Sequence, residues 1–198
     1  MSQPYASVLL FGPPGAGKGT QGKRLGQLDH CVHLATGDMF RGLDKDSELG
    51  RKVASYSSKG ELVPDDVTVE LWQSHVAGMV ERGEYDPAAD LLLLDGIPRS
   101  VGQAAALEGL IEPKAILHLV VTDLDAMVAR MKGRAETEGR ADDADEEVIR
   151  NRFAVYDRET APVLGHYDPA LVHDVDAQLS IDDVFKATSG LIAGLLSG

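Results

Sequence analysis

The chain has 198 residues, 43% of them hydrophobic, which is enough to bury the core of one compact domain. Its 32 acidic and 19 basic residues give a net charge of −13, which argues against nucleic-acid binding because that requires a basic face. No apolar run approaches a membrane span, no signal-peptide pattern opens the chain, and a single cysteine, Cys31, excludes a disulfide framework. We therefore expect a cytoplasmic protein without membrane partners.

The first predicted elements are a strand, a glycine-rich loop and a helix. An apolar run at residues 8–11 leads directly into GPPGAGKGT at residues 12–20. Glycines let consecutive backbone N–H groups face one point, and the helix opened by Lys18 adds its N-terminal dipole. The pattern resembles G-x-x-x-x-G-K-[ST], except that Gly19 stands at the Ser/Thr position and Thr20 follows it. This segment predicts a cradle for the phosphates of a nucleoside triphosphate, with Lys18 on the outer phosphates.

A polar segment with a helical pattern follows the second strand-like run, residues 32–34. It begins near Gly37 and ends at Gly60-Glu61-Leu62-Val63-Pro64, where glycine and proline stop a helix. We expect an insertion into the core, and such polar, glycine-flanked segments are candidates for lids. Arg41, close behind the strand, would face the crevice at the carboxyl edge of the sheet.

The third strand, residues 91–94, is wholly apolar and ends in Asp95. In parallel sheets the ligand crevice lies at the carboxyl ends of the strands, so Asp95 is predicted beside the phosphate loop. Its functional interpretation is a Mg²⁺ ligand, direct or through water, with Thr20 nearby; the alternative is a helix N-cap. Arg99 lies just past the end of this strand and could bind a second anion together with Arg41. Two anion-binding poles around one crevice indicate transfer between two nucleotides.

A fourth strand, residues 116–121, precedes a set of arginines around a short loop predicted at residues 133–143. The set comprises Arg130, Arg134, Arg140, Arg150 and Arg152. Arg130 and Arg134 are four apart and share a helix face, whereas Arg150 and Arg152 lie on different faces of the next helix. We expect Arg152 to point inward and Arg150 to pair in solvent with the acidic residues 145–147, the end of the acidic run 142–147.

The last predicted elements are a strand at residues 171–175 and a helix that Ser180 caps. One face of that helix is apolar and comprises Ile181, Val184, Phe185, Thr188, Leu191, Ile192 and Leu195. Because strands and helices alternate along the chain, we predict an α/β fold of βαβ units around a parallel sheet.

Six motifs, in one order along nearly the whole chain, resemble the adenylate kinases, which are nucleoside monophosphate kinases. They are GPPGAGKGTQ (12–21), ATGDMFR (35–41), KGELVPDDVT (59–68), LDGIPRSVGQA (94–104), GRAETEGRADD (133–143) and RNRFAVYDRETAPV (150–163). The resemblance implies a P-loop kinase domain with three α/β/α layers and a five-stranded parallel sheet. The core would be 1–35, 65–133 and 141–198, with a helical AMP-binding insertion at 36–64 and a short lid at 134–140.

The resemblance also implies a role for each residue that matches the motifs. The ATP-binding residues would be Gly15, Ala16, Gly17, Lys18, Gly19, Thr20, Arg130, Arg134 and, through its backbone, Gln178. The AMP-binding residues would be Thr36, Arg41, Glu61, Leu62, Val63, Gly96, Ile97, Pro98, Arg99, Gln103, Arg140 and Arg152. The catalytic residues would be Lys18, Arg99, Arg134, Arg140 and Arg152, while Mg²⁺ would arrive with ATP and lie near Asp95 and Thr20, through water. ADP would be the product, and the resemblance suggests a monomer.

Some features depart from the family pattern. Ala35 replaces the usual serine and Ile97 the usual phenylalanine, and only five residues separate Arg134 from Arg140. Larger relatives carry a sizeable lid there, sometimes with a four-cysteine zinc site. A single cysteine cannot form that site, so no structural zinc is expected.

Several alternatives stay open at this point. Thr36 and Gln103 favour AMP over the acceptors of a UMP/CMP kinase. A GTP:AMP phosphotransferase is harder to distinguish from a kinase that uses ATP, because contacts to the donor base are mostly made by the backbone. A GTP-binding switch module would be expected to carry an N-K-x-D segment, which the sequence lacks, and a non-catalytic nucleotide-binding protein needs fewer arginines.

Overall fold

The computed structural model describes residues 3–138 and 143–196, and this part of the chain contains a five-stranded parallel sheet. Its strand order is β2-β3-β1-β4-β5, and every neighbouring pair is parallel. The strands are β1 (Tyr5–Phe11), β2 (Cys31–Ala35), β3 (Leu91–Asp95), β4 (Ile111–Val120) and β5 (Val172–Asp176). The structure therefore confirms all five predicted strands and the parallel sheet.

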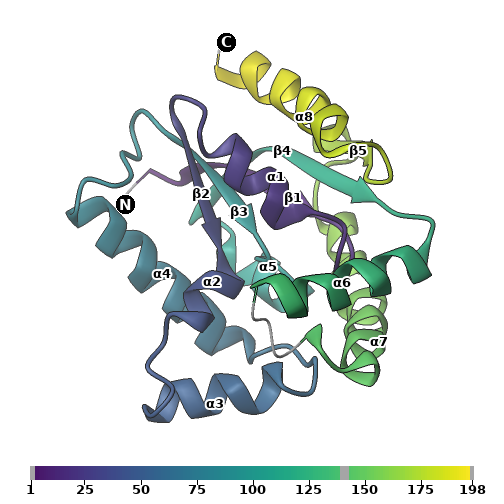
Figure 1. Ribbon diagram of the computed structural model, residues 1–198. Helices are drawn as coiled ribbons and strands as arrows, with labels where there is room; N and C mark the ends of the chain where they lie inside the picture. Colours follow the sequence, from purple (N-terminus) through teal and green to yellow (C-terminus); the bar gives the residue numbers. More distant parts are fainter. Residues whose placement is uncertain (1–2, 139–142, 197–198) are drawn as a thin grey trace.

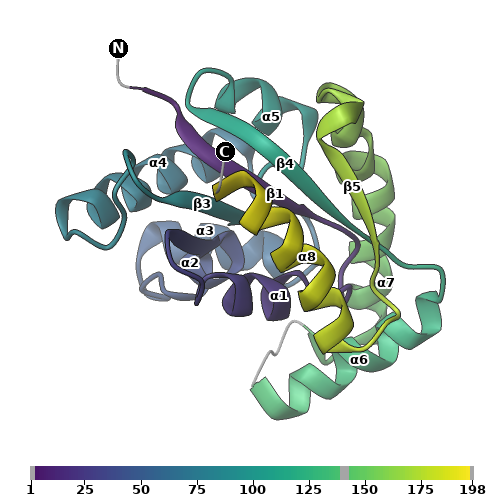
Figure 2. The ribbon, with the colours of Figure 1, turned by 90° about the horizontal axis from the view of Figure 1, so that it is seen from above.

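Helices cover both faces of the sheet. They are α1 (Lys18–Leu25), α2 (Thr36–Arg41), α3 (Glu48–Ser57), α4 (Asp65–Glu81), α5 (Val101–Leu107), α6 (Leu124–Glu138), α7 (Glu146–Val155) and α8 (Ile181–Leu196). Figures 1 and 2 show α1 and α8 over one face and α4 and α5 over the other, which confirms the three-layer α/β/α arrangement. A π-helical turn (Tyr156–Thr160) and two short 3-10 helices (Ala161–His166 and Pro169–Leu171) join α7 to β5.

Alternation of side chains along the strands builds two separate cores. In β1, Val8 and Leu10 belong to the cluster under α1 and α8, whereas Leu9 and Phe11 belong to the cluster under α4 and α5. β3 is paired on both sides and covered on both faces, so all five of its residues are buried. This burial explains why its sequence is a continuous apolar run.

The sheet brings three strand ends to one edge. Asp95, the last residue of β3, pairs with Leu10 of β1 on one side and with Ala35 of β2 on the other. The loops that follow β1, β2 and β3 therefore open side by side. This common edge positions the candidate site.

Residues 36–64 contain two helices, α2 and α3, in agreement with the predicted helical pattern. Ser47 caps α3 by accepting a hydrogen bond from the N–H of Gly50. The end of this segment lies against α7, where the side chain of Asn151 donates a hydrogen bond to the carbonyl of Lys59 at 2.7 Å.

The loop predicted at 133–143 is wrong for its first half, because α6 continues through Gly133 to Glu138. A glycine costs a helix only about 1 kcal/mol relative to alanine. Met127 and Met131 of α6 are fully buried against α7, and Thr137 donates a hydrogen bond back to the carbonyl of Gly133. Tertiary packing thus overrides the local signal. Residues 139–142 of that loop, including Arg140, lie outside the described residues.

The predicted face of the last helix is correct only in the middle of α8. Ser180 accepts the N–H of Asp183 as the expected cap, and Val184, Thr188 and Ile192 are buried. Ile181 and Leu195, at the ends of the predicted stripe, are exposed, because only the central turns pack on the cluster under α1 and α8 and on a smaller cluster that includes Leu119 and Val175. No helix within residues 3–138 and 143–196 has the length and apolarity that crossing a bilayer requires.

Candidate active site

The loop between β1 and α1 has the geometry of an anion cradle. Gly17 immediately precedes α1 and has a φ of 96°, a left-handed conformation that strains any residue with a Cβ atom. The N–H of Ala16 donates to the carbonyl of Pro13 at 3.2 Å and closes the loop. The first backbone N–H groups of α1 have no acceptor within the helix, so they are available to an anion.

Lys18 lies inside this loop. Its Nζ donates hydrogen bonds to the carbonyls of Gly12 at 2.6 Å and Pro13 at 3.0 Å. The pKa of Lys18 is lowered to about 8, mainly by burial; the nearby charges of Arg99 and Arg134 add to this effect, and Asp95 opposes it. A bound anion would relieve this poorly solvated charge.

Asp95 lies at the end of β3 next to the phosphate loop, with Oδ2 3.4 Å from the position a Cβ atom would take at Gly19. Burial raises the pKa of its carboxyl, but a contact from His33 and the charges of Lys18 and Arg99 outweigh burial and lower the pKa overall. The carboxylate is therefore ionised at neutral pH. A hard anionic oxygen beside a phosphate cradle fits Mg²⁺, which binds proteins through one or two carboxylates plus substrate phosphates.

Asp95 does not act as a helix cap, the alternative weighed from the sequence. Ser100 caps α5 instead, accepting the N–H of Gln103 at 3.0 Å. Thr20, predicted near the metal, lies within the first turn of α1 and is exposed.

The segment after β3 is held together by a short network. Gly96 has a φ of 84°, and a Cβ atom there would lie 2.6 Å from both the hydroxyl of Thr36 and the guanidinium of Arg99. Thr36 donates to the carbonyl of Gly96 at 2.9 Å, and Nε of Arg99 donates to the same carbonyl at 2.9 Å. The side-chain oxygen of the buried Gln103 accepts the backbone N–H of Arg99 at 2.7 Å. The structure thus brings the predicted AMP-binding residues of two strand ends into contact.

Three arginines from distant parts of the sequence converge here. Partial desolvation lowers the pKa of Arg99, and the nearby charges of Arg152 and Arg41 lower it further against the opposing effect of Asp95. Arg41 lies over Gly37 and pairs with Asp38. Arg41 and Arg152 therefore each lie within electrostatic range of Arg99, and cations gathered in this way could bind a second anion beside the phosphate loop.

Asp143 is a residue of the site that sequence reasoning missed. It is fully buried, and its two oxygens accept hydrogen bonds from Arg134 on α6 at 2.9 Å and Arg152 on α7 at 2.6 Å. It lies within an acidic run that is typical of a solvated surface, so no local signal marks it. Arg150 pairs with Glu146 on the exposed side of α7, which confirms that prediction.

The remaining predicted residues lie at two edges of the site. Arg130 donates to the carbonyl of Ala177 at 3.2 Å, so α6 meets the turn that carries Gln178. The segment Glu61–Val63 follows Gly60, where an added Cβ would lie 2.9 Å from Cγ of Arg152. Arg140 lies outside the described residues.

The chain combines a parallel sheet with a phosphate loop after β1, an acidic end to β3 and two groups of basic side chains. This combination is typical of P-loop phosphotransferases. A sequence profile of the family described as "Adenylate kinase" matches residues 10–171. The chain is 42% identical to the adenylate kinase of Kocuria rhizophila over 183 residues, which cover 89% of this chain and 93% of that protein. Identity to the adenylate kinase of Nocardia farcinica is 44%, with the same coverage of both chains. The adenylate kinase of Flavobacterium psychrophilum is 37% identical, over 96% of this chain and 99% of its own.

The chain therefore belongs to the adenylate kinase family, as its motifs predicted, and is a nucleoside monophosphate kinase.

Proposed function

We propose that this site transfers the γ-phosphoryl group of Mg·ATP to AMP, reversibly, giving two ADP. The observation that carries the proposal is the pair of anion-binding poles on either side of Asp95. One pole is the phosphate loop with Lys18, and the other is the convergence of Arg41, Arg99 and Arg152. One pole suits the triphosphate of the donor, and the other suits the phosphate of the acceptor.

Catalysis would consist of positioning and charge stabilisation. The nucleophile is a phosphate oxygen of AMP that is already ionised at neutral pH, so the reaction needs no general base. Lys18, Arg99, Arg134 and Arg152 would neutralise charge on the transferred group, and Arg140 completes this proposed set. Asp143 would hold Arg134 and Arg152 together before the substrates arrive.

Asp95 would hold Mg²⁺, directly or through its water shell, and Thr20 lies in the adjacent first turn of α1. When bound, Mg²⁺ neutralises charge between the β- and γ-phosphates. The ionised state of Asp95 supports this role.

We propose AMP as the acceptor because of the orientation of Gln103. Its amide oxygen accepts the backbone N–H of Arg99, so its amide nitrogen is the group that can donate to a ring nitrogen of adenine. Thr36, Gly96, Ile97 and Pro98 would form the wall beside the base.

The decisive experiment is ADP formation from Mg·ATP with AMP, CMP, UMP or GMP supplied in turn, repeated with GTP as donor. Rapid transfer to AMP alone is the expected result. Rapid transfer to CMP or UMP would overturn the acceptor assignment, and a preference for GTP would overturn the donor assignment. No transfer to any monophosphate, in a folded protein that binds ATP, would overturn the proposal and favour a binding or switch module.

Residues 36–64 would act as the AMP-binding insertion and residues 134–140 as a short lid, of which 134–138 form the end of α6. The contact of Lys59 with Asn151 supports an insertion that can reach α7. We further propose a monomer that works in the cytoplasm.

A further inference from the structure

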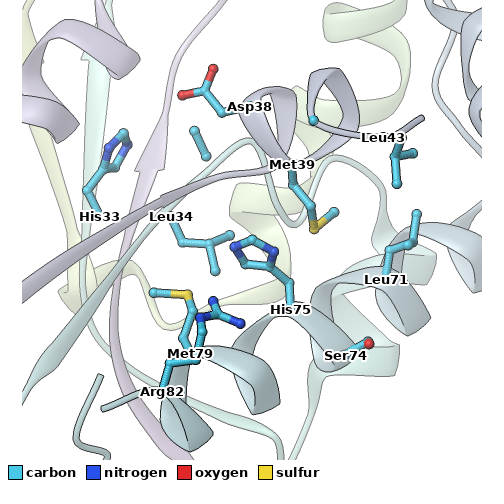
Figure 3. Close-up of a pocket in the computed structure, with 12 residues that line it drawn as sticks. His33, Leu34, Asp38, Met39, Leu43, Leu71, Ser74, His75, Met79 and Arg82 are labelled. Atoms are coloured by element: carbon cyan, nitrogen blue, oxygen red, sulfur yellow. The ribbon is translucent and has the colours of Figure 1, made fainter. Parts of the chain in front are cut away.

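A pocket of about 540 Å³ lies between β2, α2 and α4 (Figure 3). Its volume falls within the range of small-molecule sites, roughly 300–1,000 Å³. Leu34, Met39 and Met79 line it and are buried, so its inner surface is apolar. None of the described residues predicted to bind ATP or AMP lines it. The proposed reaction therefore leaves this pocket unused.

One wall of the pocket is the free edge of β2. This strand is the outermost of the sheet, and within the described residues it pairs only with β3. The carbonyl of His30 accepts the N–H of Leu91 at 2.8 Å, and in a parallel pair every second residue bonds to the neighbouring strand. Every second residue after His30 therefore faces β3, whereas the backbone groups of the residues between them, including His33 and Ala35, face away from the sheet.

His33 and Ala35 both line the pocket. The side chain of His33 lies beneath α1, where a Cβ atom at Gly22 would be 2.2 Å from its Nε2, so this residue reaches the pocket with its backbone. The carbonyl of His33 and the N–H of Ala35 have no hydrogen-bond partner within residues 3–138 and 143–196. The edge of β2 thus offers the pocket one acceptor and one donor, side by side.

The interior of the pocket suits an aromatic ring. In Figure 3 the side chain of Met39 points from α2 toward His75 of α4, and Met79 lies one turn further along α4. Thioethers are polarisable and make favourable contacts with aromatic rings. A planar ring between these side chains would bring its edge to the backbone of β2.

The charges around the pocket favour an uncharged ligand. Asp38 and Arg82 line it, and each has a partner of opposite charge, since Asp38 pairs with Arg41 and Arg82 with Glu84. A charged ligand would lose its hydration without gaining a free counter-charge, and that loss is costly.

We propose that this pocket binds an uncharged aromatic heterocycle that carries an amino group next to a ring nitrogen, as an adenine base does. The amino group donates to the carbonyl of His33, and the ring nitrogen accepts the N–H of Ala35. The thioethers of Met39 and Met79 pack against the ring. The site is separate from both anion-binding poles, and the inference does not rest on the proposed reaction.

Adenosine is the probe, because it presents this edge without a phosphate group for either pole. A bisubstrate analogue, two adenosines joined by phosphates, first fills both poles, so that only a further site can bind the probe. Calorimetry then gives the Kd of adenosine, expected on the order of 0.1 mM for a ligand of this size.

Inosine is the matched ligand, because its edge presents the acceptor and the donor in reversed order. Two hydrogen bonds are then lost, so inosine is expected to bind at least about tenfold more weakly than adenosine. Absence of adenosine binding to the analogue-saturated protein would overturn the inference, and so would equal binding of the two nucleosides.

Ala35→Pro removes the donor that the inference uses. Proline is tolerated on an edge strand where the N–H faces away from the sheet, and Ala35 is extended, with φ −104° and ψ 117°. Adenosine binding should weaken at least about tenfold, while binding of the bisubstrate analogue shows that the variant is folded. Unchanged adenosine binding would contradict the assignment of this edge.

Two substitutions on α4 decide the question if Ala35→Pro does not fold. Ser74 lines the pocket, and Ser74→Trp would fill it and abolish adenosine binding. Ala77, one turn further along the same helix, lines a different cavity of about 420 Å³, so Ala77→Trp is the matched control and should leave the Kd unchanged. Equal effects of the two tryptophans on adenosine binding would overturn the inference.

Discussion

Arg99 is anchored by its backbone as firmly as by its side chain. Its carbonyl accepts the hydroxyl of Thr160 at 2.7 Å, and its N–H donates to Gln103 at 2.7 Å. Both contacts survive substitution, so a variant at this position changes the guanidinium and leaves the loop in place. Kinetic effects at Arg99 can then be attributed to charge and geometry.

We predict that Arg99→Lys is nearly as damaging as Arg99→Ala. A lysine keeps the charge but cannot reproduce a bidentate fork, so each variant should lose about 100- to 1000-fold in kcat, or about 3–4 kcal/mol. Initial rates of ADP formation at saturating substrates measure this. Arg150→Lys, on the exposed side of α7, is the matched control and should turn over normally. Near-normal turnover by Arg99→Lys would contradict the prediction.

Lys18 predicts a dependence of stability on pH. Its pKa is about 8 in the folded chain and 10.5 as an ordinary lysine, so the unfolded chain binds more protons between these values. Below pH 8 the charged Lys18 therefore lowers the free energy of unfolding, and this effect disappears above pH 10.5. The free-energy difference corresponds to about 3 kcal/mol at most.

Lys18→Met should be inactive, yet it should gain stability relative to the parent at pH 7. Urea unfolding at pH 7, 8.5 and 10 measures the difference in free energy of unfolding between the two proteins. This difference is expected to shrink as the pH rises. A difference that stays constant with pH would show that the lysine is not desolvated as its position implies.

At the scale of elements, the course of α6 makes a prediction about Gly133. Among the described residues, no heavy atom other than the chain neighbours and the local helix backbone lies within 4 Å of the position a Cβ would take there, and the residue is helical. Gly133→Ala should therefore raise the free energy of unfolding by about 1 kcal/mol. Thermal or urea unfolding measures it, and a destabilised variant would argue that α6 is broken at this residue in solution.

Gly60→Ala is the contrasting case. Gly60 has a φ of 72°, and its Cβ would lie 2.8 Å from the carbonyl of Val148 on α7. Alanine should destabilise the protein by about 1–3 kcal/mol through backbone strain and this clash. The changes in free energy of unfolding of the two variants are therefore expected to have opposite signs. That result would show that the helix tolerates Gly133, whereas the contact between two segments requires Gly60.

For the whole molecule, the proposed insertion and lid predict a change in dimensions. Residues 36–64 and the end of α6 approach the site from two sides, and closure over substrate would exclude water from the transfer. Small-angle X-ray scattering should give a smaller radius of gyration with a bisubstrate analogue than without it. Equal dimensions in the two states would argue against closure. AMP alone, which would fill only the acceptor pole, serves as the intermediate control.

The sequence by itself determined the strands, the phosphate loop and the acidic end of β3. These features are local: an apolar run sets a buried strand, glycines set the loop, and Lys18 and Asp95 follow their strands directly. Because parallel strands end at one edge, the approximate position of both residues also followed from the pattern.

Only the tertiary structure decided which side chains meet. In the sequence, Asp143 is one member of an acidic run and nothing marks it as buried, whereas packing of α6 on α7 buries it between Arg134 and Arg152. Packing also carries α6 through Gly133, and pairing of β2 with β3 directs His33 at Asp95. Contacts of this kind join residues far apart in the chain. They depend on strand order and on which helix faces are buried, and local sequence propensity specifies neither.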